Sequence, residues 1–305
     1  MIVIKKGMKG VELRILRYFL TIADEENFSR AAEILHVTQP TMSRQMTQLE
    51  EELGVKLFQR TTRNVVLTED GMLLRRRAEE ILSLADKTAQ ELMQQGEELE
   101  GTISIGTGEF EAFNILTDYI KSFSELYPKV HFNIVSQSAD YTKEHLERGL
   151  VDLALMLEPV DTEKFEAVPL PTVEQYTVLM RPDDPLAQLE EIRQKDLAGK
   201  PQIIPLRRVG PHKRWMGSYY EEKNFRYTVN LPNNGAVLVS KGLGYFITIR
   251  STAAYYENWG LVYRPIRGAK DWKVFLVWKR YQPNSRTVSK FIEHILQGLK
   301  SQSAE

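Results

Sequence analysis

The chain has 305 residues, which at ~150 residues per domain predicts about two domains. Its 42% hydrophobic and 27% charged residues are typical of soluble globular proteins and exclude collagen-like, disordered and disulfide-stapled chains. Lys and Arg number 40 against 41 Asp and Glu, which excludes a uniformly basic nucleic-acid-binding protein but leaves a local basic face open. The absence of cysteine excludes a disulfide framework, a thiolate nucleophile and a Cys-based zinc site.

The N-terminus lacks the features of a secretory signal, because its apolar run at 1–4 is short and its charges follow that run. No window approaches the ~20 apolar residues of a membrane span. We therefore expect a cytoplasmic protein that makes no contact with a membrane.

Residues 11–54 have the pattern of three helices. Apolar residues repeat at helical spacing from Leu13 to Ala23, and Asn27 is predicted to cap a short helix over 28–36. The next helix carries Pro40 in its first turn and a single apolar face, and Gly54 is predicted to end it.

The segment 28–44 predicts a helix-turn-helix, in which the second helix enters the DNA major groove. Polar side chains that face away from the apolar side of this helix can read bases or contact phosphates, and they are Thr41, Arg44, Gln45 and Gln48. The alternative is an ordinary helical hairpin with a polar outer face.

Two apolar runs at 57–58 and 65–67 flank a polar centre and predict a small hairpin. Arg60 and Arg63 would stand at its tip, as basic residues do in a winged helix. The alternative is a pair of solvated arginines. A helix-turn-helix followed by a basic hairpin and a long helix is more specific than any of these parts alone.

Thr68 is predicted to cap a helix that continues to about Glu100, with Glu69 and Asp70 in its first turn. A helix of this length usually pairs with a second copy, although a core helix of one domain is the alternative. The spacing predicts a heptad seam, made of Leu74, Ala78, Ile81, Ala85, Thr88 and Leu92.

After Gly101, strand-like runs alternate with helical patterns. This alternation predicts a mostly parallel sheet with helices on its faces, in about two small α/β lobes. The pair Gly106 and Gly108 lacks the third glycine of a dinucleotide loop, and the five histidines have no metal-ligand spacing. Because no catalytic motif is present either, we expect neither an enzyme nor a bound cofactor or metal.

Residues 13–82 resemble the DNA-binding half of LysR-type transcriptional regulators. The stretches that carry the resemblance are LRYFL at 16–20, FSRAA at 28–32, TQPTMSRQ at 38–45, LEEELG at 49–54, LFQR at 57–60 and LTEDG at 67–71. The remaining two thirds resembles the effector-binding half of the family in pattern, with signatures at 149–155 and 242–245.

The resemblance implies an α/β chain with an N-terminal winged helix-turn-helix domain over 8–68 and a linker and dimerisation helix over 69–100. A bilobal effector-binding domain of the periplasmic-binding-protein type would follow over 101–305. Lobe I would comprise 101–160 and 268–305 and lobe II 161–267, so the chain would cross between them near 160 and 267. Dimers formed through the linker helix would assemble into homotetramers.

The partner implied is double-stranded promoter DNA, read as an imperfect inverted repeat by two symmetry-related helices. The candidate DNA-binding residues are Ser29, Arg30, Gln39, Pro40, Thr41, Ser43, Arg44, Gln48, Arg60 and Arg63. Residues 1–68 carry ten basic and eight acidic side chains, a net charge of only +2. We therefore expect weak non-specific affinity, with useful affinity arising when several heads bind together.

The second partner implied is a small-molecule effector in the cleft between the lobes. Hydroxyl and amide groups and helix-start N–H groups there would suit a small organic anion such as a carboxylate. Ala139 departs from the family pattern, since many members have Ser or Thr at this position. The candidate effector-binding residues are Thr107, Gly108, Glu109, Ser136, Ser138, Arg207, Asn234 and Phe246.

Two other classes of protein were weighed. A solute-binding module of a transporter has the same bilobal architecture but would be exported and would lack the first 100 residues. An α/β enzyme would need a catalytic constellation, and the sequence offers none.

Overall fold

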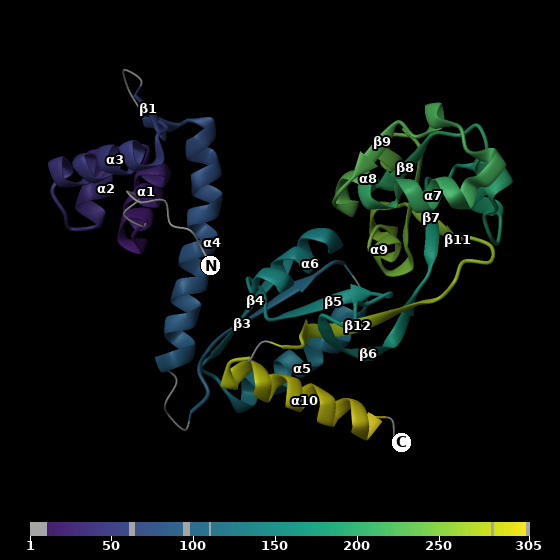
Figure 1. Cartoon of the computed structure of the whole chain (residues 1–305). Helices are drawn as coiled ribbons and strands as arrows, with labels where there is room; N and C mark the ends of the chain where they lie inside the picture. The colour runs from purple at the N-terminus through teal and green to yellow at the C-terminus, as the bar shows by residue number, and fades with distance from the viewer. Residues whose placement is uncertain (1–10, 61–64, 94–97, 110, 282–283, 303–305) are drawn as a thin grey trace. The chain divides into compact units, whose positions relative to one another are not determined.

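The computed structural model describes residues 11–60, 65–93, 98–109, 111–281 and 284–302. The chain divides after Met93 into two compact units, a head and a larger effector unit. The elements of the head are α1 (Leu13–Glu25), α2 (Phe28–Ile34), α3 (Gln39–Leu53), β1 (Phe58–Arg60), β2 (Val65–Leu67) and α4 (Glu69–Met93) (Figure 1).

The predicted helix ends in the head are confirmed. The side chain of Asn27 accepts hydrogen bonds from the backbone N–H groups of Ser29 and Arg30, at 2.9 and 3.2 Å. Gly54 ends α3 with a left-handed φ of 72°, a conformation that favours glycine. The hydroxyl of Thr68 accepts the N–H of Gly71 at 2.9 Å and caps α4.

The core of the head joins α1, α3 and the first half of α4. Phe19, Met42 and Met46 are buried in it, and so are Ala78 and Leu82 of α4. The predicted heptad seam is therefore wrong in its first part, because Ala78 faces the core of its own head and Leu74 packs against that core. The helix also ends at Met93, short of the expected Glu100.

The effector unit contains two five-stranded sheets. The first has the order β4-β3-β5-β12-β6 and the second the order β11-β7-β10-β8-β9. The strands of the first sheet are β3 (Gly101–Thr107), β4 (Val130–Ser136), β5 (Leu153–Leu157), β6 (Phe165–Glu174) and β12 (Trp272–Lys279). Those of the second are β7 (Tyr176–Met180), β8 (Gln202–Pro205), β9 (Tyr227–Val229), β10 (Tyr245–Ile249) and β11 (Val262–Pro265).

Six α-helices and several single-turn 3-10 segments accompany these sheets. Helices α5 and α10 share a core with the first sheet, in which Phe123 and Phe291 are fully buried. The helices are α5 (Ala112–Leu126), α6 (Ala139–Arg148), α7 (Val209–Met216), α8 (Pro232–Ser240), α9 (Arg250–Ala254) and α10 (Arg286–Gln302).

The sheets are mixed, so the expectation of a mostly parallel sheet is wrong. In the first sheet β3 runs parallel to β4 and β5, but β12 runs antiparallel to both β5 and β6. In the second sheet β8 runs parallel to β9 and β10, whereas β7 runs antiparallel to β10 and β11. The antiparallel strands are those that lead into and out of the two crossings between sheets.

The first crossing lies later than expected. Strand β6 pairs with β12 along its length, from Phe165 opposite Lys279 to Glu174 opposite Trp272. The segment after 160 therefore adds an edge strand to the first sheet, and the chain reaches the second sheet only at Tyr176. The return crossing runs between Pro265 and Trp272. Within the described residues, no helix is long and apolar enough to span a bilayer.

Candidate nucleic-acid interface and ligand cleft

Helix α3 is fixed by its inner face and by the turn that precedes it. Met42, Met46 and Leu49 are buried in the core of the head. In the preceding turn, His36 adopts a left-handed φ of 54° and the N–H of Val37 donates to the carbonyl of Ala32 at 2.9 Å. The opposite face of α3 is consequently directed to solvent.

The outer face of α3 forms a shallow hollow. It brings together five of the predicted DNA-binding residues, and its lining is Gln39, Pro40, Ser43, Arg44, Thr47, Gln48 and Glu51. The side chains of Arg44 and Gln48 are exposed, and the Gln48 amide donates to Glu52 at 2.9 Å. A guanidinium, two amides and two hydroxyls thus share one accessible helix face, the group types that recognise base edges and phosphates.

The other predicted DNA-binding residues are placed elsewhere. Thr41 is half-buried and its hydroxyl is hydrogen-bonded to that of Thr38 at 2.8 Å. Ser29 and Arg30 are exposed at the start of α2, where Arg30 forms a 2.8 Å ion pair with Glu25. The side chain of Arg60 and the whole of Arg63 lie outside the described residues.

Glu50 joins α3 to the hairpin, a role that the sequence analysis missed. Its carboxylate accepts the N–H groups of Leu57 and Phe58 at 2.8 and 3.3 Å and pairs with the Lys56 ammonium at 2.6 Å. Partial burial would raise the pKa of Glu50, but these hydrogen bonds outweigh burial and lower it. The carboxylate therefore stays charged and fixes the hairpin next to the end of α3.

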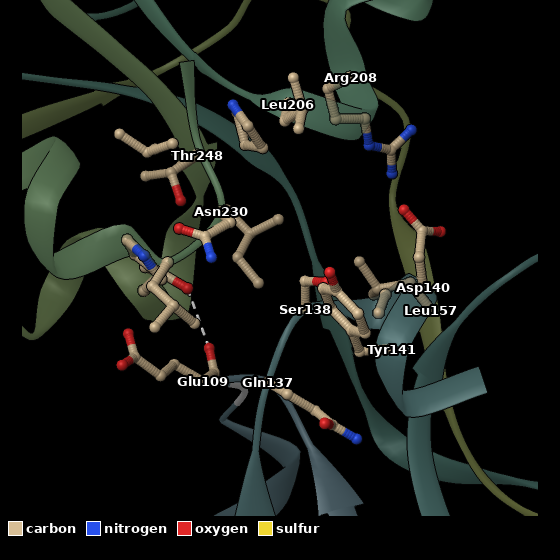
Figure 2. Close-up of a pocket in the computed structure, with 18 of the residues that line it drawn as sticks. Glu109, Gln137, Ser138, Asp140, Tyr141, Leu157, Leu206, Arg208, Asn230 and Thr248 are labelled. Atoms are coloured by element: carbon tan, nitrogen blue, oxygen red, sulfur yellow. Dashed lines mark hydrogen bonds between the residues drawn. The ribbon is translucent and has the colours of Figure 1, made fainter. Parts of the chain in front are cut away.

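The effector unit contains a cleft of about 620 Å³ between the two sheets (Figure 2). On the first side it is reached by the ends of β3 and β4, which are parallel and so place Thr107 beside Ser136. The full lining is Gly108, Glu109, Ser136, Gln137, Ser138, Ala139, Asp140, Tyr141, Leu157, Tyr176, Pro205, Leu206, Arg208, Thr228, Val229, Asn230, Leu231, Pro232, Phe246, Thr248, Ile249 and Thr252.

Five of the predicted effector-binding residues line this cleft: Gly108, Glu109, Ser136, Ser138 and Phe246. Thr107 is instead buried behind the surface, where its hydroxyl donates to the carbonyl of Gly108 at 2.7 Å. The placement of Asn234 is wrong, because α8 begins at Pro232 and Asn234 is exposed within the helix, so that Asn230 lines the cleft. The side chain of Arg207 lies outside the described residues, and Arg208 lines the cleft.

The cleft carries both signs of charge. Partial burial raises the pKa of Glu109, and a hydrogen bond from Tyr256 offsets part of this effect. Figure 2 shows the Asp140 carboxylate and the Arg208 guanidinium pointing toward one another from the two sides of the cleft. The dashed line marks the 2.9 Å hydrogen bond from the Thr252 hydroxyl to the Glu109 carbonyl, which ties α9 to the loop after β3.

Further polar residues of the lining escaped the sequence analysis: Asp140, Tyr141, Thr228, Asn230, Thr248 and Thr252. Asp140 and Tyr141 follow the start of α6, so the apolar-run signal for that helix, which began at Thr142, placed them too early in the chain. Thr248 and Thr252 flank the end of β10, where alternation inside a short buried strand gives no sign of which face meets a cleft.

Comparisons with known families agree with this division. Residues 13–72 match the model described as a bacterial regulatory helix-turn-helix protein of the lysR family. Residues 96–300, about two thirds of the chain, match the LysR substrate binding domain. The chain belongs to the LysR family. In this LysR-family protein the helix-turn-helix match ends within α4, and the second match begins just after it.

Individual relatives cover different shares of this LysR-family chain. A hydrogen peroxide-inducible genes activator of Pectobacterium carotovorum subsp. carotovorum is 32% identical over 194 residues, which is 64% of this chain and 64% of that protein, so the match spans less than two thirds of it. The uncharacterized HTH-type transcriptional regulator YcgK of Bacillus subtilis is 24% identical over 311 residues, 95% of each chain.

Among solved structures, full-length CbnR complexed with its target DNA matches with a TM-score of 0.69 and 21% identity. The match covers 94% of this chain and 99% of that chain, and at this identity it bears on the fold. The relatives are named as gene activators or transcriptional regulators.

Proposed function

We propose that this LysR-family protein is a sequence-specific DNA-binding transcriptional regulator whose action on double-stranded promoter DNA responds to a small-molecule effector. The observation that carries the proposal is the outer face of α3, where Arg44 and Gln48 lie exposed in one hollow while the inner face is locked into the core. A helix held in this way can enter the major groove without rearrangement.

Within that groove, Arg44 would donate to a guanine edge or a phosphate, and the amides of Gln39 and Gln48 would pair with bases or the backbone. Pro40 and Gln39 stand at the positive end of the α3 dipole, which favours a phosphate. Two heads related by two-fold symmetry would then read an imperfect inverted repeat. We place the protein in the cytoplasm, where such DNA is found.

The cleft is the proposed effector site. Its volume lies within the range of pockets that hold small ligands. Arg208 provides one cation, and Glu109 and Asp140 provide acceptors, so the best-fitting effector is a small organic acid that also carries hydrogen-bond donors. A response to peroxide through cysteine oxidation, which the name of one relative might suggest, is excluded because the chain has no cysteine.

The test of the DNA-binding proposal is Arg44→Ala on the full chain, measured by fluorescence anisotropy with a duplex enriched from a randomised library. We expect a loss of about 1–3 kcal/mol per head, the scale of one good base contact. Arg14→Ala is the matched control, since it also removes an exposed arginine of the head but lies on α1, outside the hollow. Unchanged affinity for Arg44→Ala, or an equal loss for Arg14→Ala, would contradict the role of α3.

A further inference from the structure

A second cavity lies in lobe II against both crossings between the sheets. It measures about 220 Å³. Its floor is apolar, with Ile204, Ile247 and Ile266 all buried, and its walls are aromatic, with Trp215 on one side and Trp272 on the other. We call this cavity the hinge pocket, because Tyr176 begins the strand after the first crossing and Trp272 begins the strand after the return crossing.

The mouth of the hinge pocket is cationic. Arg208 lies 4.8 Å from the centre of the Tyr176 ring and 5.3 Å from that of Trp272, and the Lys270 ammonium lies 5.1 Å from the Trp272 ring. Lys270 also forms a 3.3 Å ion pair with Glu158, which neutralises part of its charge. No Asp or Glu is among the described residues that line the pocket itself.

The remaining titratable wall residue is neutral. His212 is buried, and this burial lowers its pKa to about 4, so it carries no charge at neutral pH. Its Nε2 lies 2.7 Å from Oε1 of Gln202, whose amide nitrogen donates to the Leu197 carbonyl. His212 is therefore assigned as the Nε2–H donor and serves as a flat aromatic wall.

We propose that the hinge pocket is a second ligand site, distinct from the main cleft, that takes a single-ring aromatic carboxylate. The volume admits one ring, the apolar floor and tryptophan walls suit its faces, and the two cations at the mouth suit a carboxylate that remains at the solvent edge. Arg208, Tyr176 and Pro205 line both this pocket and the main cleft. A ligand in one site therefore acts on walls of the other.

The pocket also touches the contacts that hold the two crossings together. The N–H of Ile266 donates to the Tyr176 carbonyl at 3.2 Å, and the side chains of Gln175 and Asp271 are hydrogen-bonded to each other. The rings of Tyr176 and Trp272 meet edge to face with centroids 6.2 Å apart. A bound ring would stiffen these contacts and restrict movement between the lobes.

The test uses the full-length protein and three probes: phenylacetate, neutral phenylacetamide, and acetate. Two of the four tryptophans line the pocket, so binding is followed by tryptophan fluorescence and by calorimetry. We expect phenylacetate to bind one per chain in the low-millimolar range or tighter, on the order of what a ligand of this size can reach. Phenylacetamide should bind about 10-fold more weakly, and acetate should not bind. No binding of phenylacetate would overturn the proposal.

Two variants assign the site. Ala269→Phe fills the hinge pocket and should weaken phenylacetate at least about 10-fold, whereas Ser138→Phe obstructs the main cleft and should leave that affinity unchanged. Loss in Ser138→Phe alone would place the ligand in the main cleft, overturning this proposal while supporting the effector site. If Ala269→Phe fails to fold, Lys270→Glu on the exposed rim replaces it, and equal effects on phenylacetate and phenylacetamide would overturn the role of charge.

Hydrogen exchange supplies a readout at the hinge. Phenylacetate should slow exchange of the Ile266 amide, which is bonded across the two crossings. Binding with unchanged exchange of peptides covering 175–178 and 264–268 would contradict the stiffening of the hinge.

Discussion

At the scale of single residues, Glu50 decides whether the hairpin stays beside the reading helix. Its side chain is only 11% exposed and accepts two backbone N–H groups as well as the Lys56 ammonium. We expect Glu50→Gln to destabilise the head by about 1–2 kcal/mol, because a charge-assisted acceptor of buried N–H groups is replaced by a weaker one. Hydrogen exchange of head amides in the full chain measures this, and Glu51→Gln on the neighbouring position should show no loss.

The same carboxylate predicts a pH dependence. Its folded pKa is lowered, so its stabilisation is present above the ordinary value of 4.5 and disappears as the pH falls through the folded pKa. The difference in head stability between the original chain and Glu50→Gln should therefore shrink as the pH falls below about 4.5. A difference that stays constant through this window would contradict the role of the charge.

Single residues also mark how far the sequence predicts the site. The cap at Asn27 and the end of α3 at Gly54 were predictable because each depends on local hydrogen bonding or a left-handed φ. The effector cleft was predicted by its strand ends, but Asn234 failed because α8 starts two residues earlier than its apolar pattern suggests. An error of a few residues at a helix start moves a different side chain into the cleft.

At the scale of elements, α4 presents apolar side chains that its own head does not cover. Leu73, Ile81 and Leu84 are 52%, 47% and 42% exposed, while Ala78 and Leu82 are buried in the head core. We propose that the exposed residues meet a second α4 in a homodimer. Ile81→Glu should then weaken dimerisation by about 10- to 100-fold, because a charge would be buried in an apolar contact.

Sedimentation over a range of protein concentrations checks this prediction. Ser83→Glu is the matched control, since it adds the same charge to an exposed position on another side of the same helix. A monomeric original chain at micromolar concentration, or equal effects of both variants, would contradict dimerisation through this face.

Elements differ in how visible they are in the sequence. The helices of the head and the central strands were predicted because each combines a regular apolar period with a clear start or stop. Strands β6 and β11 were missed because they contain Pro169, Pro171 and Pro265, which disfavour a strand in sequence reasoning. Both strands lie at sheet edges, where proline is tolerated because one side of the strand has no ladder partner. The late first crossing follows from the same omission.

At the scale of the whole molecule, the cleft should couple ligand binding to proton uptake. The pKa of Glu109 is raised by burial, so it becomes protonated at a higher pH than an ordinary carboxyl. An anionic effector should therefore bind more tightly as the pH falls through this pKa, since the repelling charge is lost. Calorimetry against pH with an effector found by thermal-shift screening measures the trend. Glu109→Gln should flatten it, and an unchanged slope in that variant would rule Glu109 out as its source.

The central claim is that α3 reads DNA sequence, and in vitro selection from a randomised duplex library with the full-length protein tests it most directly. The account predicts enrichment of an imperfect inverted repeat, with half-sites spaced for two reading helices on one face of the duplex. It also predicts that Arg44→Ala loses preference at one position of each half-site. Failure to enrich any sequence, or the same motif with equal strength from Arg44→Ala, would contradict it.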